Sequence, residues 1–257
     1  MLIERAASKL CEMREQSKIG DEPSPKPTGA LTPPLQLLLA LLMGTLPLAA
    51  IVYFLVGFEL SSLGLSLAAY VIAGFLALRL IGRGFPYPTL GAPNLVTLFR
   101  LVVVAALLSA SLGVANAWLI VFLATFALVL DGVDGYLARK QNWVSDFGAR
   151  LDMEVDTALA LVLAIIAAAT QVIGVWVLFL ALPRYLFVAA ARFLPWLWAP
   201  LPYSLARRVV SVLQITALIV INAPVLGGLF ALPVAIAAAL LLLWSFGRDI
   251  LWLWRNR

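Results

Sequence analysis

The sequence predicts an all-α polytopic membrane protein, from its composition, the length of its apolar stretches and the placement of its basic residues. Of the 257 residues, 63% are apolar and 12% are charged, and the mean hydropathy is +1.03. A soluble domain has roughly 45–50% apolar and about 25% charged residues. The chain is therefore too apolar and too poor in charge to be a water-soluble globule.

Eight apolar stretches approach the length of about 20 residues that a helix needs to cross a bilayer. They cover residues 34–57, 62–82, 95–112, 116–138, 148–170, 171–195, 206–222 and 225–246. With eight spans and both termini in the cytoplasm, all 18 Lys and Arg residues lie at or near the cytoplasmic side, as the positive-inside rule requires. Seven or nine spans would place a basic cluster outside. We therefore expect eight spans in the cell (inner) membrane.

The segments that flank the spans have a different character. Residues 1–33 are expected to form a polar cytoplasmic tail. Apolar residues at helical spacing near its start favour a short amphipathic helix, either on the membrane surface or in solvent. Residues 247–257 are expected to form an interfacial C-terminal tail.

The composition also excludes several kinds of chemistry. Histidine is absent, so catalysis and metal binding by histidine are excluded. Cys11 is the only cysteine, which rules out an internal disulfide and a cysteine zinc cluster. The net charge of +5 is modest and spread along the chain, and it gives no support to nucleic-acid binding.

Acidic residues are concentrated where the fourth and fifth apolar stretches join. Six of the 13 acids lie there: Asp131, Asp134, Asp146, Asp152, Glu154 and Asp156. A carboxylate in or near hydrocarbon is costly unless it is paired or bound to a cation. Such a concentration therefore indicates a function rather than packing.

Helix geometry predicts that four of these carboxylates converge. Asp131 and Asp134 are three residues apart, and Asp152 and Asp156 are four apart, so each pair lies on one helix face. A short connection makes the two helices antiparallel neighbours, which brings the two faces together. Oxygen ligands in this arrangement suit a hard divalent cation. Glu154 should face away from this cage.

An all-protein alternative is a buried salt-bridge network. In that interpretation Arg139, Lys140 and Arg150 would neutralise the acids. It is the weaker hypothesis, because such a network adds little net stability and needs no glycines at positions 135 and 148.

The spacing of these residues resembles the signature of the CDP-alcohol phosphotransferases. From Asp131 to Asp156 the chain has the pattern DxxDGxxARx8GxxxDxxxD. The segment Pro93–Arg100 (PNLVTLFR) is similar to the entry of the first core helix in that family. The resemblance covers a six-helix core at residues 91–246. It leaves out residues 34–90, which form two additional transmembrane helices.

The resemblance implies an activity and a set of site residues. Family members move a substituted phosphate from a CDP-alcohol, such as CDP-diacylglycerol, to an alcohol acceptor and release CMP, in phospholipid biosynthesis. Asp131, Asp134 and Asp152 would hold Mg²⁺ or Mn²⁺. Asp156 would lie close to the metals and act as general base for the acceptor hydroxyl. The active site would face the cytoplasm, and a homodimer is expected.

The resemblance also implies a binding site for the CDP-alcohol. Its candidate residues are Gly135, Ala138, Arg139, Gly148, Asn94 and Thr97. Gly135, Ala138 and Gly148 would shape the cytidine pocket, and Arg139 would meet the pyrophosphate.

Four arginines are candidates for binding the acceptor: Arg184, Arg192, Arg207 and Arg208. An intramembrane arginine is a functional candidate, and the stretch around Arg207 is loosely similar to relatives that bind phosphorylated polyols. An acceptor with a phosphate group, such as glycerol 3-phosphate or an inositol phosphate, is therefore favoured. Equally, Arg207 and Arg208 could simply follow the positive-inside rule and contact lipid headgroups.

Two other function classes remain open at the level of sequence. Intramembrane carboxylates also mark ion paths, so a divalent-cation transporter is one alternative. The other is a catalytically silent membrane scaffold. The acids lie at one end of the predicted spans and the aspartate set is intact, and both observations favour the enzyme.

Overall fold

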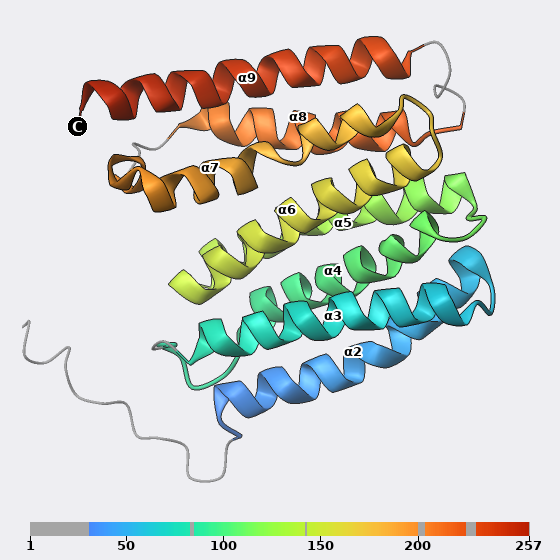
Figure 1. The fold of residues 1–257 in the computed structure, drawn as a ribbon. Coiled ribbons are helices and arrows are strands. Elements are labelled where there is room, and N and C mark those ends of the chain that lie inside the picture. Colours follow the sequence, from blue (N-terminus) through green and yellow to red (C-terminus); the bar gives the residue numbers. More distant parts are fainter. Residues whose placement is uncertain (1–30, 83–84, 142, 200–203, 225–229, 257) are drawn as a thin grey trace, which may run out of the picture.

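The computed structural model is a bundle of helices that run back and forth along one axis (Figure 1). It describes residues 31–82, 85–141, 143–199, 204–224 and 230–256. The α-helices are α2 (Pro33–Val56), α3 (Leu60–Ile81), α4 (Gly91–Leu107), α5 (Ala117–Lys140), α6 (Asp146–Ala169), α7 (Pro183–Phe193), α8 (Leu205–Ile221) and α9 (Ala231–Arg255). Three 3₁₀ turns are η1 (Leu108–Ser111), η2 (Val175–Leu180) and η3 (Pro195–Trp198).

The central element is α4, which continues into η1. Helices α2, α3, α5 and α6 all pack against it. In its most apolar stretch 72% of residues are buried, against 22% to 28% for α2, α3, α5 and α9. A helix that is apolar on all sides is expected in the interior of a bundle. Of these five helices, α4 with η1 is therefore the most enclosed.

The outward faces of the bundle suit lipid rather than water. Large apolar side chains such as Met43, Phe54 and Leu243 are 70% to 74% exposed. Among the described residues, five helices are long and apolar enough to cross a membrane: α2, α3, α4 with η1, α5 and α9. An apolar surface this extensive would promote aggregation in water. The predicted class, an all-α polytopic membrane protein, is confirmed.

Two predicted stretches have different boundaries in the structure. Residues 171–195 do not form one continuous helix: η2 ends at Leu180, and α7 begins at Pro183. Proline has no N–H to continue a helix, and the amide of Gln214 donates a hydrogen bond to the Leu180 carbonyl, 2.5 Å away. The second is the boundary at residue 247, because α9 continues across it without a break to Arg255, and the interfacial position of residues 247–257 stays a prediction.

The predicted polar tail lies largely outside the described residues, since residues 1–30 are not described.

The two additional helices, α2 and α3, pack closely against each other. The Tyr70 hydroxyl donates to the Leu41 carbonyl at 3.0 Å, and a Cβ at Gly44 would lie 2.2 Å from that hydroxyl. Small residues at such contacts let membrane helices approach each other.

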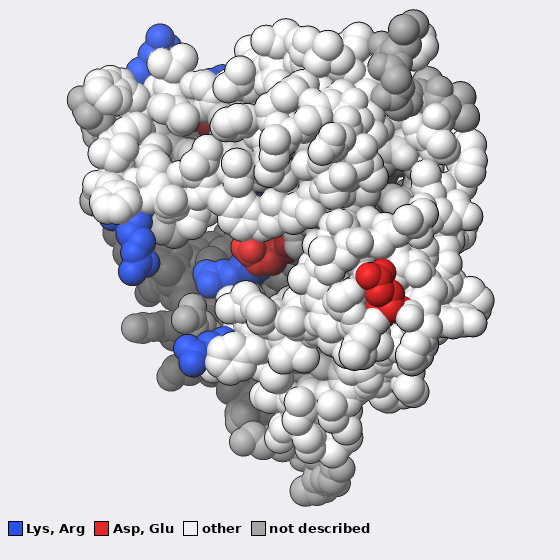
Figure 2. All heavy atoms as spheres, turned by 45° about the vertical axis from the view of Figure 1, so that its right-hand side comes forward, with Lys and Arg blue, Asp and Glu red and all other residues white. Residues whose placement is uncertain are grey.

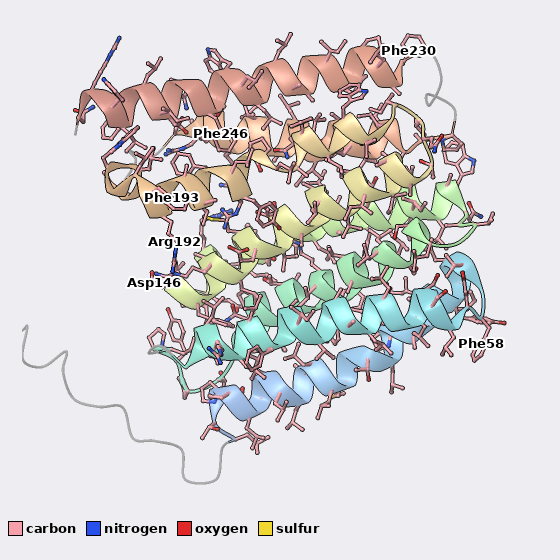
Figure 3. The ribbon with its side chains drawn as sticks, in the orientation of Figure 1. Phe58, Asp146, Arg192, Phe193, Phe230 and Phe246 are labelled. Carbon is pink, nitrogen blue, oxygen red and sulfur yellow. The ribbon has the colours of Figure 1, made fainter. Side chains whose placement is uncertain are left out.

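The two ends of the bundle carry different residues. Figure 3 shows Asp146, Arg192 and Phe193 at one end, and Phe58 and Phe230 at the other. The connection between α5 and α6 lies at the first end, together with the start of α4 (Figure 1). We call this the α5–α6 end.

Candidate active site

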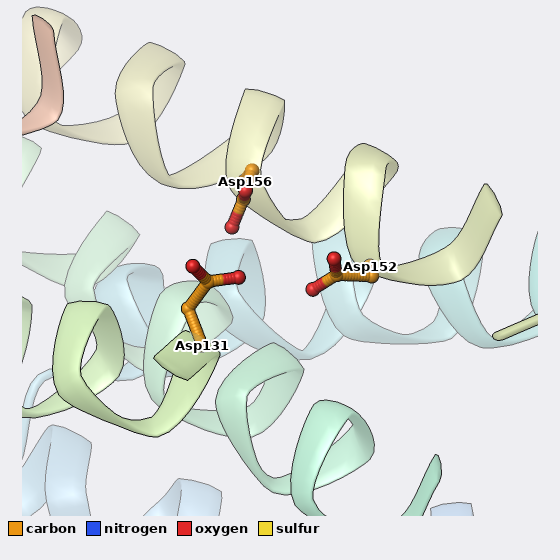
Figure 4. Close-up of side chains that lie close together, drawn as sticks. All are labelled: Asp131, Asp152 and Asp156. Atoms are coloured by element: carbon orange, nitrogen blue, oxygen red, sulfur yellow. The ribbon is translucent and has the colours of Figure 1, made fainter. Parts of the chain in front are cut away.

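Three carboxylates from α5 and α6 face one another near the α5–α6 end. Oxygens of Asp131, Asp152 and Asp156 all lie within 4.8 Å of one another (Figure 4). The start of α6 is fixed by Ser145, whose hydroxyl accepts a hydrogen bond from the Gly148 N–H at 3.0 Å. This cap defines where α6 begins, and so places the face that carries Asp152 and Asp156 opposite Asp131.

Arg100 of α4 is a member of this site that the sequence analysis did not assign. Its side chain is fully buried, and its guanidinium contacts all four signature aspartates. Nη1 lies 3.2 Å from Asp131, 2.9 Å from Asp134 and 2.5 Å from Asp152, and Nη2 contacts Asp156. One signal was available: Arg100 is the only charged residue between Arg83 and Asp131. An arginine that isolated within apolar sequence is a functional candidate.

Asp134 differs from the other three aspartates in its surroundings. It is 4% exposed, and the same oxygen that contacts Arg100 lies 2.9 Å from the Thr97 hydroxyl. It is not part of the group within 4.8 Å formed by Asp131, Asp152 and Asp156. In this structure Asp134 therefore holds α4 to α5, and the other three carboxylates form the open part of the cluster.

The salt-bridge alternative predicts that basic residues pair with the aspartates. The arginine that does so in the structure is Arg100. Among the described residues, Arg139, Lys140 and Arg150 make no ion pair with the aspartates. Arg100 supplies one positive charge against four negative ones, so the cluster keeps an excess of negative charge. A hard divalent cation, which takes oxygen ligands, fits this donor set.

A pocket of about 220 Å³ opens beside the carboxylates. Its lining includes all six residues predicted to bind the CDP-alcohol, namely Asn94, Thr97, Gly135, Ala138, Arg139 and Gly148. It also includes Asp134 and Asp152, so the pocket and the acidic cluster share a wall. The structure thus brings the predicted residues together, and their binding of a nucleotide stays a prediction.

Close packing explains why glycine occupies position 148. A Cβ there would lie 2.8 Å from Oδ1 of Asn94, closer than real Cβ contacts. At Gly135 the nearest side-chain atom to such a Cβ is a guanidinium nitrogen of Arg139, at 3.4 Å. Because neither Gly135 on α5 nor Gly148 on α6 has a side chain, both leave space in the pocket that they line.

Trp143 closes the pocket from the α5–α6 connection. Its ring stacks on Tyr87 with centroids 4.3 Å apart. Its buried indole N–H has no hydrogen-bond acceptor in the described part of the protein. The sequence analysis gave this residue no role in the site. A buried donor without a partner is unusual, and here it lies against Gly91, at the turn that leads into α4.

The four acceptor candidates lie on α7 and α8 and do not line this pocket. Arg184 lies 2.6 Å from Glu154, which is not part of the group formed by Asp131, Asp152 and Asp156. Arg207 lies 3.5 Å from Asp249 of α9. Arg192 and Arg208 form no ion pair within the described residues. Acceptor binding by these arginines stays a prediction.

Charged side chains are few on the face shown in Figure 2. On the face shown in Figure 2, acidic and basic side chains meet in a hollow near the middle of an otherwise mostly uncharged surface.

Comparison with known proteins decides the family. Residues 90–247 match the model of the CDP-alcohol phosphatidyltransferase family. The chain belongs to this family. Its members are metal-dependent enzymes that transfer substituted phosphate groups, and the acidic triad of Asp131, Asp152 and Asp156 could bind such a metal.

The chain is also similar to proteins named "Putative cardiolipin synthase" from Mycobacterium bovis and Mycobacterium tuberculosis. The identity is 32% over 111 residues, which cover 43% of this chain and 52% of each relative. The match thus spans about half the length of those relatives. No solved structure matches the chain.

Proposed function

We propose that this family member transfers a phosphatidyl group from CDP-diacylglycerol to an alcohol that carries a phosphate group, and releases CMP. The observation that carries the proposal is the shared wall: Asp134 and Asp152 belong both to the acidic cluster and to the pocket lined by the other signature residues. A ligand in that pocket would place its pyrophosphate next to the carboxylates.

Different residues of the site would bind different parts of a CDP-alcohol and the metal ion. The pocket walls at Gly135 and Gly148 leave room for the cytidine, and Arg139 is within reach of the pyrophosphate, which a guanidinium binds well. Asp131, Asp152 and Asp156 would hold Mg²⁺ or Mn²⁺, with Asp134 beside them. Bound there, the metal neutralises pyrophosphate charge and stabilises the leaving CMP.

Asp156 is our candidate for the general base. Its carboxylate would accept the proton of the acceptor hydroxyl while the hydroxyl oxygen forms a bond to the lipid-side phosphorus. The bond from that phosphorus to the oxygen of CMP breaks, and CMP leaves with the electron pair. Arg100 contacts Asp156 and Asp152, so it orients both carboxylates from a third helix.

The acceptor is proposed from two features outside the pocket. Four arginines stand on α7 and α8, where a phosphate group could be bound, and similar proteins carry the name cardiolipin synthase. We therefore propose an acceptor with both a hydroxyl and a phosphate group, either a phosphorylated polyol or a lipid such as phosphatidylglycerol. The reaction would take place at the cytoplasmic face of the cell membrane.

The test is an assay of CMP release by the purified protein in mixed micelles. CDP-diacylglycerol and Mg²⁺ or Mn²⁺ would be supplied with glycerol 3-phosphate, an inositol phosphate or phosphatidylglycerol in separate reactions. We expect metal-dependent CMP release and one matching lipid product, with Asp152→Asn inactive. Failure to release CMP from CDP-diacylglycerol with every acceptor would refute the proposed donor.

A further inference from the structure

Helix α2 precedes the region that matches the family, yet one of its side chains reaches the start of the site. The Gln36 side-chain oxygen accepts a hydrogen bond from the backbone N–H of Leu90, 2.9 Å away and 54 residues along the chain. Leu90 is the N-cap residue, immediately before α4 begins at Gly91, and it is 2% exposed. Gln36 is half-buried at this contact.

The backbone conformation and the packing of the turn that follows Leu90 are both tightly constrained. Gly91 has φ of +77°, a conformation that glycine adopts without a steric penalty. A Cβ at this position would lie 2.2 Å from Nε1 of Trp143, so the turn is also packed against the ring that closes the pocket. The side chain of Leu90 cannot cap the helix, and Gln36 supplies from α2 an acceptor for a backbone group at the helix start.

Leu90 in turn fixes the orientation of a pocket residue. The Leu90 carbonyl accepts a hydrogen bond of 2.6 Å from the side-chain nitrogen of Asn94. Because that nitrogen is used, the side-chain oxygen of Asn94 points to the other side, where it lies next to Gly148. Both residues line the pocket. A continuous chain of contacts therefore runs from Gln36 through Leu90 to Asn94.

We infer that Gln36 is a positioning residue for the nucleotide pocket, acting through Leu90 on Asn94. This inference rests on the proposed function, and it gives the additional helix α2 a role in donor binding. It predicts that loss of the Gln36 oxygen raises the KM for the CDP-alcohol donor and leaves the KM for the acceptor unchanged. The reason is that the chain of contacts ends in the pocket wall and not at α7 or α8.

Two substitutions separate the contact with Leu90 from the other bond that Gln36 makes. Gln36 Nε2 also donates to the Leu31 carbonyl at 2.6 Å. Gln36→Leu removes both bonds, whereas Gln36→Glu keeps an oxygen for the Leu90 N–H and loses only the donor. Thr45→Val is the matched control, because it also removes a side-chain hydrogen bond of α2, the one that Thr45 donates to the Leu42 carbonyl.

The experiment measures KM for CDP-diacylglycerol, KM for the acceptor and kcat, together with hydrogen exchange of residues 88–97. For Gln36→Leu we expect the donor KM to rise roughly five-fold, as for one net hydrogen bond, and exchange at the start of α4 to accelerate. The acceptor KM should stay at the wild-type value. Gln36→Glu and Thr45→Val should resemble the wild type in all four measurements.

Several outcomes would overturn the inference. One is an unchanged donor KM in Gln36→Leu, and another is a parallel rise in the donor and acceptor KM values. If the wild type shows no turnover, the proposed function fails, and hydrogen exchange alone decides the positioning role. Exchange at residues 88–97 that does not change in Gln36→Leu would then exclude it.

Discussion

At the centre of the acidic cluster a single guanidinium serves four carboxylates drawn from two helices. Arg100 is fully buried, and it contacts Asp131, Asp134, Asp152 and Asp156. Breaking a buried ion pair by removing one partner costs about 3–5 kcal/mol, because it leaves uncompensated buried charge. We expect Arg100→Gln to lower the thermal unfolding temperature in detergent, and added Mg²⁺ to raise that temperature more in the variant than in the wild type.

Arg79→Gln is the control for this prediction. Arg79 is exposed at the end of α3, where it lies over the ring of Phe75, 4.8 Å from its centroid. Its removal should change the unfolding temperature little. Equal losses in the two variants would contradict the structural role that we assign to Arg100.

The metal-binding prediction concerns the carboxylates themselves. Asp131→Asn and Asp152→Asn each remove a charged oxygen ligand that a hard cation needs, so both should abolish turnover and weaken Mn²⁺ binding while the protein still folds. Asp146→Asn, an exposed acid in the first turn of α6, should keep both properties. Near-normal turnover of Asp131→Asn in the presence of a chelator would refute the metal site.

The role of Asp156 can be separated from that of a simple ligand. Asp156→Asn keeps the size of the side chain but cannot accept a proton, so turnover should fall by roughly 10²–10⁴-fold, the usual contribution of a general base. Binding of the CDP-lipid should be affected less than in Asp131→Asn. The measurement is affinity and turnover across a Mg²⁺ titration, and rescue of turnover by extra Mg²⁺ would identify Asp156 as a ligand instead.

At the scale of elements, the sequence predicts best what depends on local spacing. The three- and four-residue intervals between the aspartates place them on one face of α5 and one face of α6, and the structure brings those faces together (Figure 4). The contribution of Arg100 depends on the packing of α4 between other helices, which no local pattern encodes. The same holds for Gln36, which contacts a residue 54 positions away.

The interrupted segment between α6 and α8 was visible in the sequence only as Pro183. What the sequence does not show is how the interruption is stabilised. The side chain of Gln214 donates a hydrogen bond to the Leu180 carbonyl. In a continued 3₁₀ helix this carbonyl would accept from the N–H three residues later, but that residue is Pro183, which has no N–H. Apolar periodicity cannot reveal this contact, because a glutamine on α8 has no local reason to face a carbonyl on η2.

This contact gives a prediction at the same scale. Gln214→Leu should lower the free energy of unfolding by about 1–3 kcal/mol, because it leaves a carbonyl without a partner in an apolar environment. Thr216→Val, which removes a hydrogen bond to Val212 within α8, should have a much smaller effect. Denaturant unfolding of both variants in detergent would measure the difference, and equal losses would show that the interruption does not depend on Gln214.

At the scale of the whole molecule, the pocket and the candidate site residues lie near the same end of the bundle. The pocket is lined by the start of α4, the end of α5 and the start of α6, and Figure 1 shows these segments at the same end of the bundle. The loops that join α2 to α3 and α4 to α5 lie at the opposite end. If the α5–α6 end faces the cytoplasm, donor lipid and CMP would be exchanged on that side.

This orientation can be tested by labelling single cysteines in intact cells with a membrane-impermeant maleimide. Cys11 is first replaced by Ser, since it is the only native cysteine. Cysteines at Ser61, in the exposed first turn of α3, and at Ala115, in the loop before α5, lie at the far end and should be labelled from outside. A cysteine at Gln141, between α5 and α6, should be labelled only after the membrane is permeabilised. Because basic residues concentrate near the α5–α6 connection, the positive-inside rule gives this direction. Labelling of Gln141→Cys in intact cells, with Ser61→Cys protected, would reverse the orientation and place the proposed reaction on the outer face.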